Sequence, residues 1–134
     1  MKIELIGKKI ESLSLKTQSS ESSTKKKPSV KVKVNSEMYS NIKDSKLFRV
    51  RYSVDVDIES RLKIYLTYDF DFQSEEDFSE EVAKSKEVRT LVPSMSYPYI
   101  KSYAEYLISM SGLGNFNLPY FDFFSAPLEP EDEE

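Results

Sequence analysis

Carboxylates are the side chains of this sequence that could carry out catalysis, because histidine and cysteine are both absent. Histidine is the commonest general base and metal ligand, and the cysteine thiolate is a common nucleophile. Two carboxylate pairs occur at a spacing of two residues, Asp55 with Asp57 and Asp69 with Asp71. This spacing places both carboxylates of a pair on the same face of a strand, and a glycosidase-like dyad needs two carboxyl groups near each other. Such a dyad also needs one carboxyl in an apolar setting, whereas the alternating charges here predict an exposed polar face.

Other catalytic and ligand-binding patterns are missing from the sequence as well. It has 3 glycines, and none belongs to a phosphate-cradling motif. The serines have no histidine or cysteine partner, and spacing alone identifies no serine–lysine pair. The acidic ending "EPEDEE" lacks the ordered loop that calcium sites use. We therefore predict no catalytic residue, no metal site and no cofactor, and we expect that the protein is not an enzyme.

Length, charge and hydropathy indicate one soluble intracellular domain. The chain has 134 residues, with 19 Lys and Arg against 23 Asp and Glu, and a net charge of −4. This balance gives no general attraction to nucleic acid or anionic membranes. Charges interrupt the beginning "MKIELIGKKIESL" too often for a signal peptide, and no stretch approaches the roughly 20 apolar residues of a membrane span. We expect one domain over residues 1–128, an acidic tail over residues 129–134, a cytoplasmic location and no membrane insertion.

Apolar and polar residues alternate over the first part of the chain, as they do in β-strands. Residues 1–15 predict an irregular strand whose apolar register changes around Gly7, which is typical of a bulge or bend. Residues 17–29 are polar and predict a solvated loop. The next stretch, "SVKVKVN", directs three valines inward and Lys31 and Lys33 outward. Residues 35–46 are rich in turn-forming side chains and predict a connection.

The clearest predicted unit is a hairpin formed by residues 48–58 and 62–72, in which apolar side chains occupy every second position. If residues 59–61 form the turn, three pairs of opposite charges face each other on the outer surface. The apolar and charged faces therefore predict the same register. The expected inner pairs are Ile58–Leu62, Val56–Ile64, Val54–Leu66, Tyr52–Tyr68 and Phe48–Phe72, and the outer pairs are Asp57–Lys63, Arg51–Asp69 and Arg49–Asp71.

Two helices are predicted after the hairpin. Residues 78–89 have an acidic beginning and a basic end, which indicates a short or partly formed helix. Residues 98–112 predict a longer helix, with Ser96 as its cap, Pro98 in its first turn and Gly112 at its end. Its expected core face consists of Ile100, Tyr103, Ala104, Leu107, Ile108 and Ser111.

A second apolar line on the longer helix is formed by Tyr99, Tyr106 and Met110. A helix with two apolar faces needs two surfaces against which to bury them. The sheet provides one, and another element, a partner subunit or a ligand must provide the other. The stretch "NFNLPYFDFF" at residues 115–124, with five aromatic rings, predicts a similar division between core and interface. We expect Phe121 and Phe123 to return to the core.

The second half of the chain resembles the SecB family of export chaperones. The likeness lies in "VPSMSYPYIKSYAEYLISMSGLGNFNLPYFDF", and the order of strands and long loop before it agrees with that family. Tyr97, Pro98 and Tyr99 match the family's loop element that opens the second helix, which implies that Tyr97 and Tyr99 lie in a loop before that helix, and Gly112 and Gly114 stand near the following turn. The family's ending is matched by Asn117, Leu118, Pro119, Phe121, Asp122 and Phe123.

This resemblance implies an α+β fold in which a four-stranded antiparallel sheet carries two helices on one face. It also implies assembly as a dimer or a dimer of dimers, a homotetramer, with helices sandwiched between sheets of different protomers. By the same likeness, the protein would hold unfolded or partly folded polypeptides without nucleotide, in a groove lined by aromatic and aliphatic side chains. The client-binding residues that the resemblance implies are Tyr97, Tyr99, Tyr106, Met110, Phe116, Tyr120 and Phe124.

The sequence departs from export-dedicated members of the family, which end in a zinc-binding segment of cysteine and histidine. The ending "EPEDEE" is instead typical of a solvating acidic extension, so the likeness favours polypeptide holding over protein transport. An alternative is an adaptor or inhibitor, of phage, mobile-element or antitoxin-associated type, that binds one dedicated protein partner. A third function, nucleic-acid binding through residues 25–33, is disfavoured by the net charge and by the paired outer face.

Overall fold

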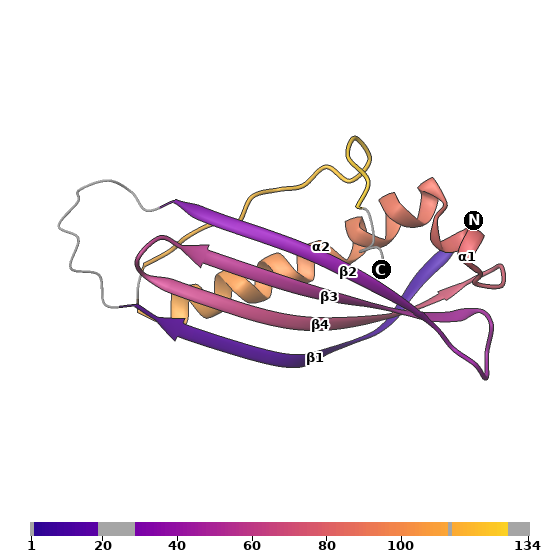
Figure 1. Cartoon of the computed structure of the whole chain (residues 1–134), viewed down its shortest axis with the longest axis horizontal. Helices are drawn as coiled ribbons and strands as arrows, with labels where there is room; N and C mark the ends of the chain where they lie inside the picture. The colour runs from indigo at the N-terminus through magenta and orange to yellow at the C-terminus, as the bar shows by residue number, and fades with distance from the viewer. Residues whose placement is uncertain (1, 19–28, 113, 129–134) are drawn as a thin grey trace.

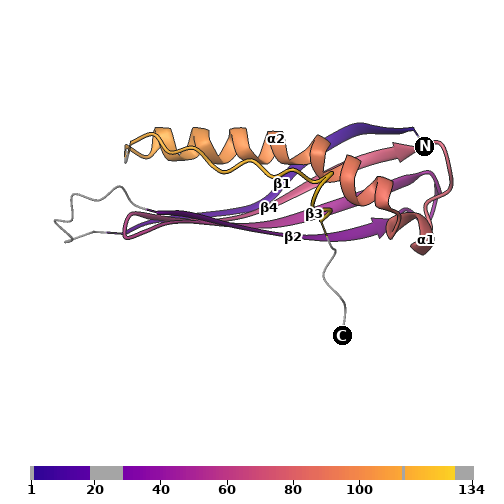
Figure 2. The same ribbon diagram turned by 90° about the horizontal axis from the view of Figure 1, so that it is seen from above.

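An antiparallel sheet of four strands, in the order β1-β4-β3-β2, carries one long helix across one face (Figures 1 and 2). The computed structural model describes residues 2–18, 29–112 and 114–128. The predicted α+β class with a four-stranded antiparallel sheet is confirmed. The elements are β1 (Ile3–Thr17), β2 (Val30–Ser40), β3 (Leu47–Ile58), β4 (Leu62–Ser74), α1 (Glu80–Ala83) and α2 (Lys86–Met110).

The hairpin of β3 and β4 has the predicted register at every pair. Ile58 is opposite Leu62 and Phe48 is opposite Phe72, with the expected partners between them. The apolar side chains on the inner face of both strands are buried in the core that they share with α2. On the outer face the side chain of Arg51 binds Asp69 through two hydrogen bonds of 2.8 and 2.9 Å. Arg49 binds Asp71 at 2.7 and 3.2 Å.

The edge strands differ in regularity. β1 pairs with β4 and contains two register shifts, one between Leu5 and Gly7, where a bulge or bend is predicted, and another between Ile10 and Ser12. β2 pairs with β3 without any shift and continues to Ser40. The predicted connection over residues 35–46 is therefore wrong in its first half, because pairing with the apolar residues of β3 keeps this polar stretch extended. Residues 19–28, most of the predicted first loop, lie outside the described residues, as does the acidic tail at 129–134.

The two predicted helices have different boundaries in the structure. α1 is a single turn capped by the Ser79 side chain, and α2 is a helix of 25 residues capped by Ser85. The predicted start of the second helix at Ser96 and Pro98 is therefore wrong, and Tyr97 and Tyr99 lie within α2 rather than in a loop before it. The predicted end is confirmed, because α2 ends at Met110 and Gly112 has a φ of 82°.

Proline 93 and proline 98 both lie inside α2. A proline lacks the N–H that would bind the carbonyl four residues earlier, which normally breaks or kinks a helix. The carbonyl of Arg89, left without its helical partner by Pro93, accepts the N–H of Leu128 at 3.2 Å. The hydroxyl of Ser96 donates to the Val92 carbonyl at 2.8 Å. The bond from Leu128 thus comes from outside the helix, and the local sequence of α2 does not reveal it.

The core lies between the inner face of the sheet and α2. Ile100, Ala104 and Ile108 are fully buried, which confirms the centre of the predicted core face of the helix. The Tyr52 hydroxyl donates to Ser96 at 3.1 Å, so the largest polar group in this layer has a partner. After α2, residues 114–128 run back alongside the helix without joining the sheet (orange to yellow in Figure 1).

Charge reversal tests the contribution of the outer ion pairs to the hairpin. Arg51→Asp places a second carboxylate beside Asp69, which is only 2% exposed. We expect this change to lower the free energy of unfolding by about 3 kcal/mol, because the buried Asp69 loses both hydrogen bonds to Arg51, faces a second carboxylate and keeps only the longer contact to Arg49 at 3.8 Å. Urea unfolding followed by far-UV circular dichroism measures the loss.

The double variant Arg51→Asp/Asp69→Arg should recover part of that stability. Lys33→Asp is the matched control, because Lys33 is exposed and stands opposite the exposed Asp55, and its loss should stay within about 1 kcal/mol. A double variant no more stable than Arg51→Asp would contradict the importance of this pair.

Candidate functional site

An uncovered apolar surface follows the outward side of α2. The exposed fractions of Tyr99, Tyr106 and Met110 are 43%, 60% and 68%. These three residues are the second apolar line predicted from the sequence, and helical spacing brings them to one side of α2. Tyr99 borders the sheet, because its ring centroid lies 6.2 Å from that of Phe70, whereas Tyr106 and Met110 are the more exposed members of the line. The surface is therefore available to another polypeptide or another subunit.

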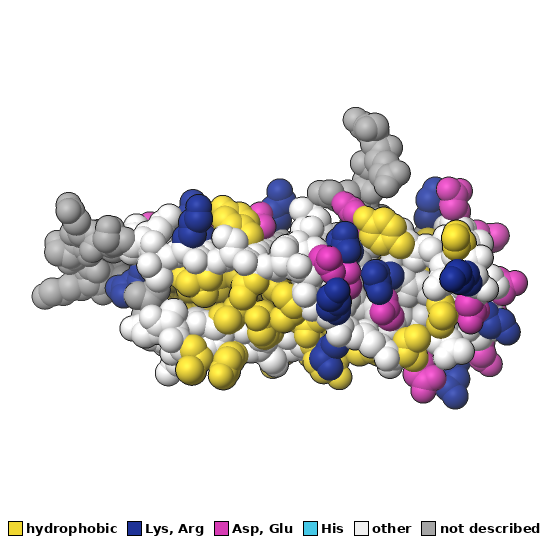
Figure 3. Space-filling model, turned by 90° about the horizontal axis from the view of Figure 1, so that it is seen from below, with side chains coloured by type: hydrophobic (Ala, Val, Ile, Leu, Met, Phe, Trp, Pro, Cys, Tyr) yellow, Lys and Arg dark blue, Asp and Glu magenta, His cyan; other side chains and the backbone are white. Residues whose placement is uncertain are grey.

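The apolar surface continues onto the edge strand β1. Leu13 is 40% exposed, while Ile10 and Leu15 are partly buried against the core. From the helix, Tyr103 and Leu107 are also partly buried against the core. Figure 3, which views the molecule from the side of β1, shows hydrophobic side chains gathered in a hollow between the sheet edge and the helix.

Lys8 lies at the border of this surface, a position that the sequence pattern does not predict. The two bulges of β1 place Lys8 opposite Phe70, whose side chain belongs to the core. The Lys8 ammonium lies 4.7 Å from the centroid of the Tyr99 ring, a cation–π contact. Strict alternation along β1 does not predict that Lys8 contacts the apolar surface. Only the observed pairing of β1 with β4 identifies Lys8 as a residue at its border.

The segment 114–128 adds a second group of aromatic residues beside α2. Leu118 and Phe123 are buried, with 3% and 6% of their surface exposed. Tyr120 and Phe124 point outward, with exposed fractions of 87% and 59%. Phe116 is partly buried against the core. The expectation that Phe123 returns to the core is thus met, whereas Phe121 remains 40% exposed.

Tyr97 connects α2 to this segment. Its hydroxyl donates to the Pro119 carbonyl at 2.7 Å, and its ring centroid lies 5.0 Å from that of Phe121 and 6.0 Å from that of Phe123. Tyr97 is only 4% exposed, so its side chain serves contacts within the chain. Burial raises the pKa of Tyr97 to about 12, and the nearby negative charge of Glu105 acts in the same direction.

The predicted site residues therefore fall into two groups. Tyr99, Tyr106 and Met110 share one side of α2. The second group lies in or against the segment beside the helix and consists of Tyr97, Phe116, Tyr120 and Phe124. The Lys101 ammonium of α2 lies 4.6 Å from the centroid of the Tyr120 ring. Sequence reasoning missed Leu13 of β1 and Glu105 of α2 as surface residues of this region. Leu13 has the same alternation as a core residue, and only its position on an edge strand distinguishes it.

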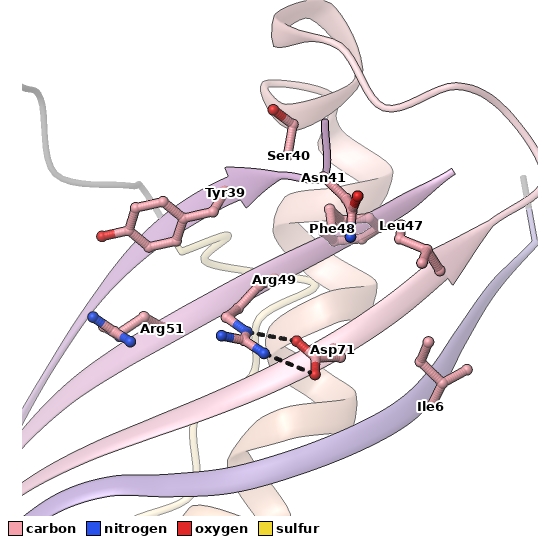
Figure 4. Close-up of a pocket in the computed structure, with 9 residues that line it drawn as sticks. All are labelled: Ile6, Tyr39, Ser40, Asn41, Leu47, Phe48, Arg49, Arg51 and Asp71. Carbon is pink, nitrogen blue, oxygen red and sulfur yellow. Dashed lines mark hydrogen bonds and ion pairs between the residues drawn. The ribbon is translucent and has the colours of Figure 1, made fainter. Parts of the chain in front are cut away.

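The outer face of the sheet has a separate open hollow of about 480 Å³ (Figure 4). Ile6 and Tyr39 lie on its sides, and Arg49, Arg51 and Asp71 contribute its polar surface. The hydrogen bond from Arg49 to Asp71 raises the pKa of Arg49, and the pair with Asp69 raises that of Arg51. Because these guanidinium groups already bind carboxylates, the hollow lacks the unpaired positive charge that an anion site needs.

Neither a metal centre nor a membrane span is found among the residues that the structure describes. No group of three or more acidic side chains in them is arranged to hold a metal ion. No helix in the same residues combines the length and apolar character needed to cross a bilayer.

Comparison with known proteins gives a structural likeness without a sequence relative. No family model matches the sequence, and no curated protein matches it. The SecB-like chaperone Rv1957 of Mycobacterium tuberculosis, solved in complex with a ChAD peptide from the HigA1 antitoxin Rv1956, superposes with a TM-score of 0.73 at 15% identity, over 89% of this chain and 90% of that one. A protein of unknown function from Streptococcus agalactiae superposes with a TM-score of 0.56 at 8% identity, over 90% and 98% of the two chains. The chain thus has a SecB-like fold.

The buried hydroxyl of Tyr97 predicts a loss of stability at alkaline pH. An unfolded tyrosine ionises near pH 10, whereas Tyr97 in the folded protein keeps its proton to about pH 12. The folded state therefore binds more protons in this interval, and the free energy of unfolding should fall as pH rises from 10 to 12. Urea unfolding followed by far-UV circular dichroism at several pH values measures this slope.

Tyr97→Phe should lower stability at neutral pH by about 1 kcal/mol through loss of the hydrogen bond to Pro119. It should also make the alkaline slope shallower, while Tyr52, whose pKa is raised by burial as well, keeps its own contribution to the slope. An unchanged slope in Tyr97→Phe would contradict the assignment.

Proposed function

We propose that this protein is an ATP-independent, SecB-like holding chaperone that binds unfolded or non-native polypeptides. The observation that carries the proposal is the uncovered apolar line of Tyr99, Tyr106 and Met110 on a helix of a SecB-like fold. Aromatic rings bury a large apolar area at small entropic cost, and methionine adapts to ligands of different shape. Together they suit clients that share exposed apolar side chains and no common sequence.

We further propose that the protein assembles as a dimer or a dimer of dimers. Leu13 and Tyr106 are large apolar residues that the protomer leaves 40% and 60% exposed. Exposed apolar patches on a soluble domain are typical of subunit or ligand contacts. The hollow between β1 and α2 would belong to the subunit contact. The apolar line of Tyr99, Tyr106 and Met110 on α2 would serve either client binding or subunit contact.

A dedicated adaptor is the second candidate. It is favoured by the likeness to Rv1957, which was solved with a peptide from a single antitoxin. An adaptor would use the same apolar surface for one partner. We propose a cytoplasmic location and a role without catalysis for either candidate. Nucleic-acid binding receives less support, because Lys31 and Lys33 stand opposite Asp57 and Asp55 in the sheet, and residues 25–27 lie outside the described part of the chain.

Dilution of several unrelated urea-unfolded proteins, without nucleotide, tests the holding function. We expect a stoichiometric amount of the protein to suppress light scattering from most of them, with little dependence on salt. Suppression that disappears steeply with rising ionic strength would indicate charge-driven binding instead. Failure with every client would contradict holding, and a co-purification from the native host would then search for a dedicated partner.

Tyr106→Ser should weaken suppression several-fold, because it removes an exposed ring from the proposed client surface. Tyr65→Ser is its matched control, since Tyr65 is also a half-exposed tyrosine, 47% against 60%, and lies on the opposite face of the sheet. Equal activity of the two variants would contradict the placement of the client surface on α2.

Sedimentation velocity tests the proposed assembly. We expect a dimer or tetramer for the unmodified protein, and a shift towards monomer for Leu13→Asp, because a charge at the β1 edge opposes apolar contact. Circular dichroism controls for folding of the variant. A monomer at all concentrations of the unmodified protein would contradict the assembly.

A further inference from the structure

Residues 115–121 lie beside α2 without regular secondary structure, and the chain then turns, with the Ala126 N–H donating to the Asp122 carbonyl at 3.0 Å. The segment forms neither helix nor strand. Its main chain is held by side chains of α2: the Leu118 N–H donates to Oε2 of Glu105 at 2.9 Å, and the Pro119 carbonyl accepts from the Tyr97 hydroxyl at 2.7 Å. Contacts to main-chain atoms do not depend on the sequence of the bound segment, so these two residues of α2 would bind another extended chain equally well.

Two apolar side chains anchor the segment. Leu118 and Phe123, five residues apart, are 3% and 6% exposed. Tyr120, two residues after Leu118, and Phe124, next to Phe123, are 87% and 59% exposed. Alternation between deeply seated and solvent-facing apolar side chains is typical of peptides in grooves, where a few anchors carry most of the binding energy.

Glu105 is fixed in place independently of the segment. The Lys101 ammonium binds Glu105 at 2.8 Å one helical turn away, so the carboxylate is oriented by its own helix. Tyr97 lies in the middle of α2, with its ring in the hydrophobic core cluster. The receptor side of the contact is thus built on a rigid element, while the segment itself lacks the backbone ladder that stabilises the strands.

We propose that residues 115–124 are an internal ligand, and that Tyr97, Glu105 and the pockets of Leu118 and Phe123 form a binding site for a polypeptide segment with two large apolar side chains five residues apart. The partner chain binds by displacing residues 115–124. This inference rests on the proposed holding function and adds a second client-binding site on α2 to the surface formed by Tyr99, Tyr106 and Met110. Because the site is open only in the fraction of molecules whose segment is displaced, the apparent affinity for clients is reduced by that fraction.

Competition with a free copy of the segment tests the proposal. The probe is a fluorescent peptide with the sequence NFNLPYFDFFS, residues 115–125, and its binding is measured by fluorescence anisotropy. Leu118→Asp in the protein removes one anchor of the internal ligand and should lower the Kd of the probe at least tenfold. Asn117→Ser is the matched control, since Asn117 is the exposed neighbour of Leu118 and its change should leave the Kd within twofold.

Hydrogen exchange is a second measurement, and it uses the unmodified protein, so it does not depend on whether a variant folds. Adding the probe peptide should speed exchange at the Leu118 amide, because displacement exposes it, while the amides of β3 and β4 remain protected. A probe with aspartate in place of both anchors should neither bind nor change the exchange. If Leu118→Asp does not fold, Leu118→Ala replaces it, with the same direction expected.

Equal Kd values for the unmodified protein, Leu118→Asp and Asn117→Ser would overturn the inference, as would unchanged or slower exchange at Leu118 on adding the probe. If unfolded proteins are held while the probe shows either of these results, only the internal-ligand site fails. If the probe binds as expected while no unfolded protein is held by any variant, the holding function fails and the site remains, as the site of a dedicated partner.

Discussion

The pairing of β3 with β4 across a three-residue turn is the constraint on which the rest of the structure depends. The Arg61 N–H donates to the Ile58 carbonyl at 2.9 Å and closes the turn. A slip of one residue would turn every apolar side chain of one strand to the outer face and would separate Arg51 from Asp69. Because both faces of the hairpin require the same register, one inner face becomes apolar along its whole length, and the remaining elements serve to cover it.

The inner face of the sheet is wider than one helix can cover. Four strands about 4.8 Å apart make a sheet roughly 19 Å wide, whereas a helix with its side chains is about 10 Å across. Residues 114–128 take part of the remaining width, which explains the burial of Leu118 and Phe123. At the β1 edge nothing in the described chain covers Leu13 completely. The incomplete covering therefore accounts both for the aromatic segment beside α2 and for an apolar edge suited to a partner.

The sequence predicted the hairpin closely because two independent patterns, apolar alternation and opposite charges, gave the same register. It failed at the beginning of α2, where Pro98 was assigned to the first turn of a shorter helix but lies inside a helix that begins at Lys86. The contact that satisfies the helix comes from Leu128, far along the chain, and no local pattern contains it. The same limit affected the site: Tyr106 and Met110 were correctly placed on the outward side of α2, whereas Tyr97 was assigned to a loop and is buried within the helix.

The contact between Leu128 and Arg89 also determines how residues 115–124 can move. A proline in a helix interior costs about 3 kcal/mol, so a hydrogen bond that replaces the partner lost at Pro93 stabilises α2 itself. The returning segment is thus held at two ends, by the end of α2 near Gly112 and by Leu128 on the early turns of the same helix. Its middle can leave Tyr97 and Glu105 by forming a loop between these two points, without loss of the bond that α2 requires. A chain anchored in this way exchanges with an incoming peptide at small entropic cost, since its ends stay in place and only the intervening residues gain freedom.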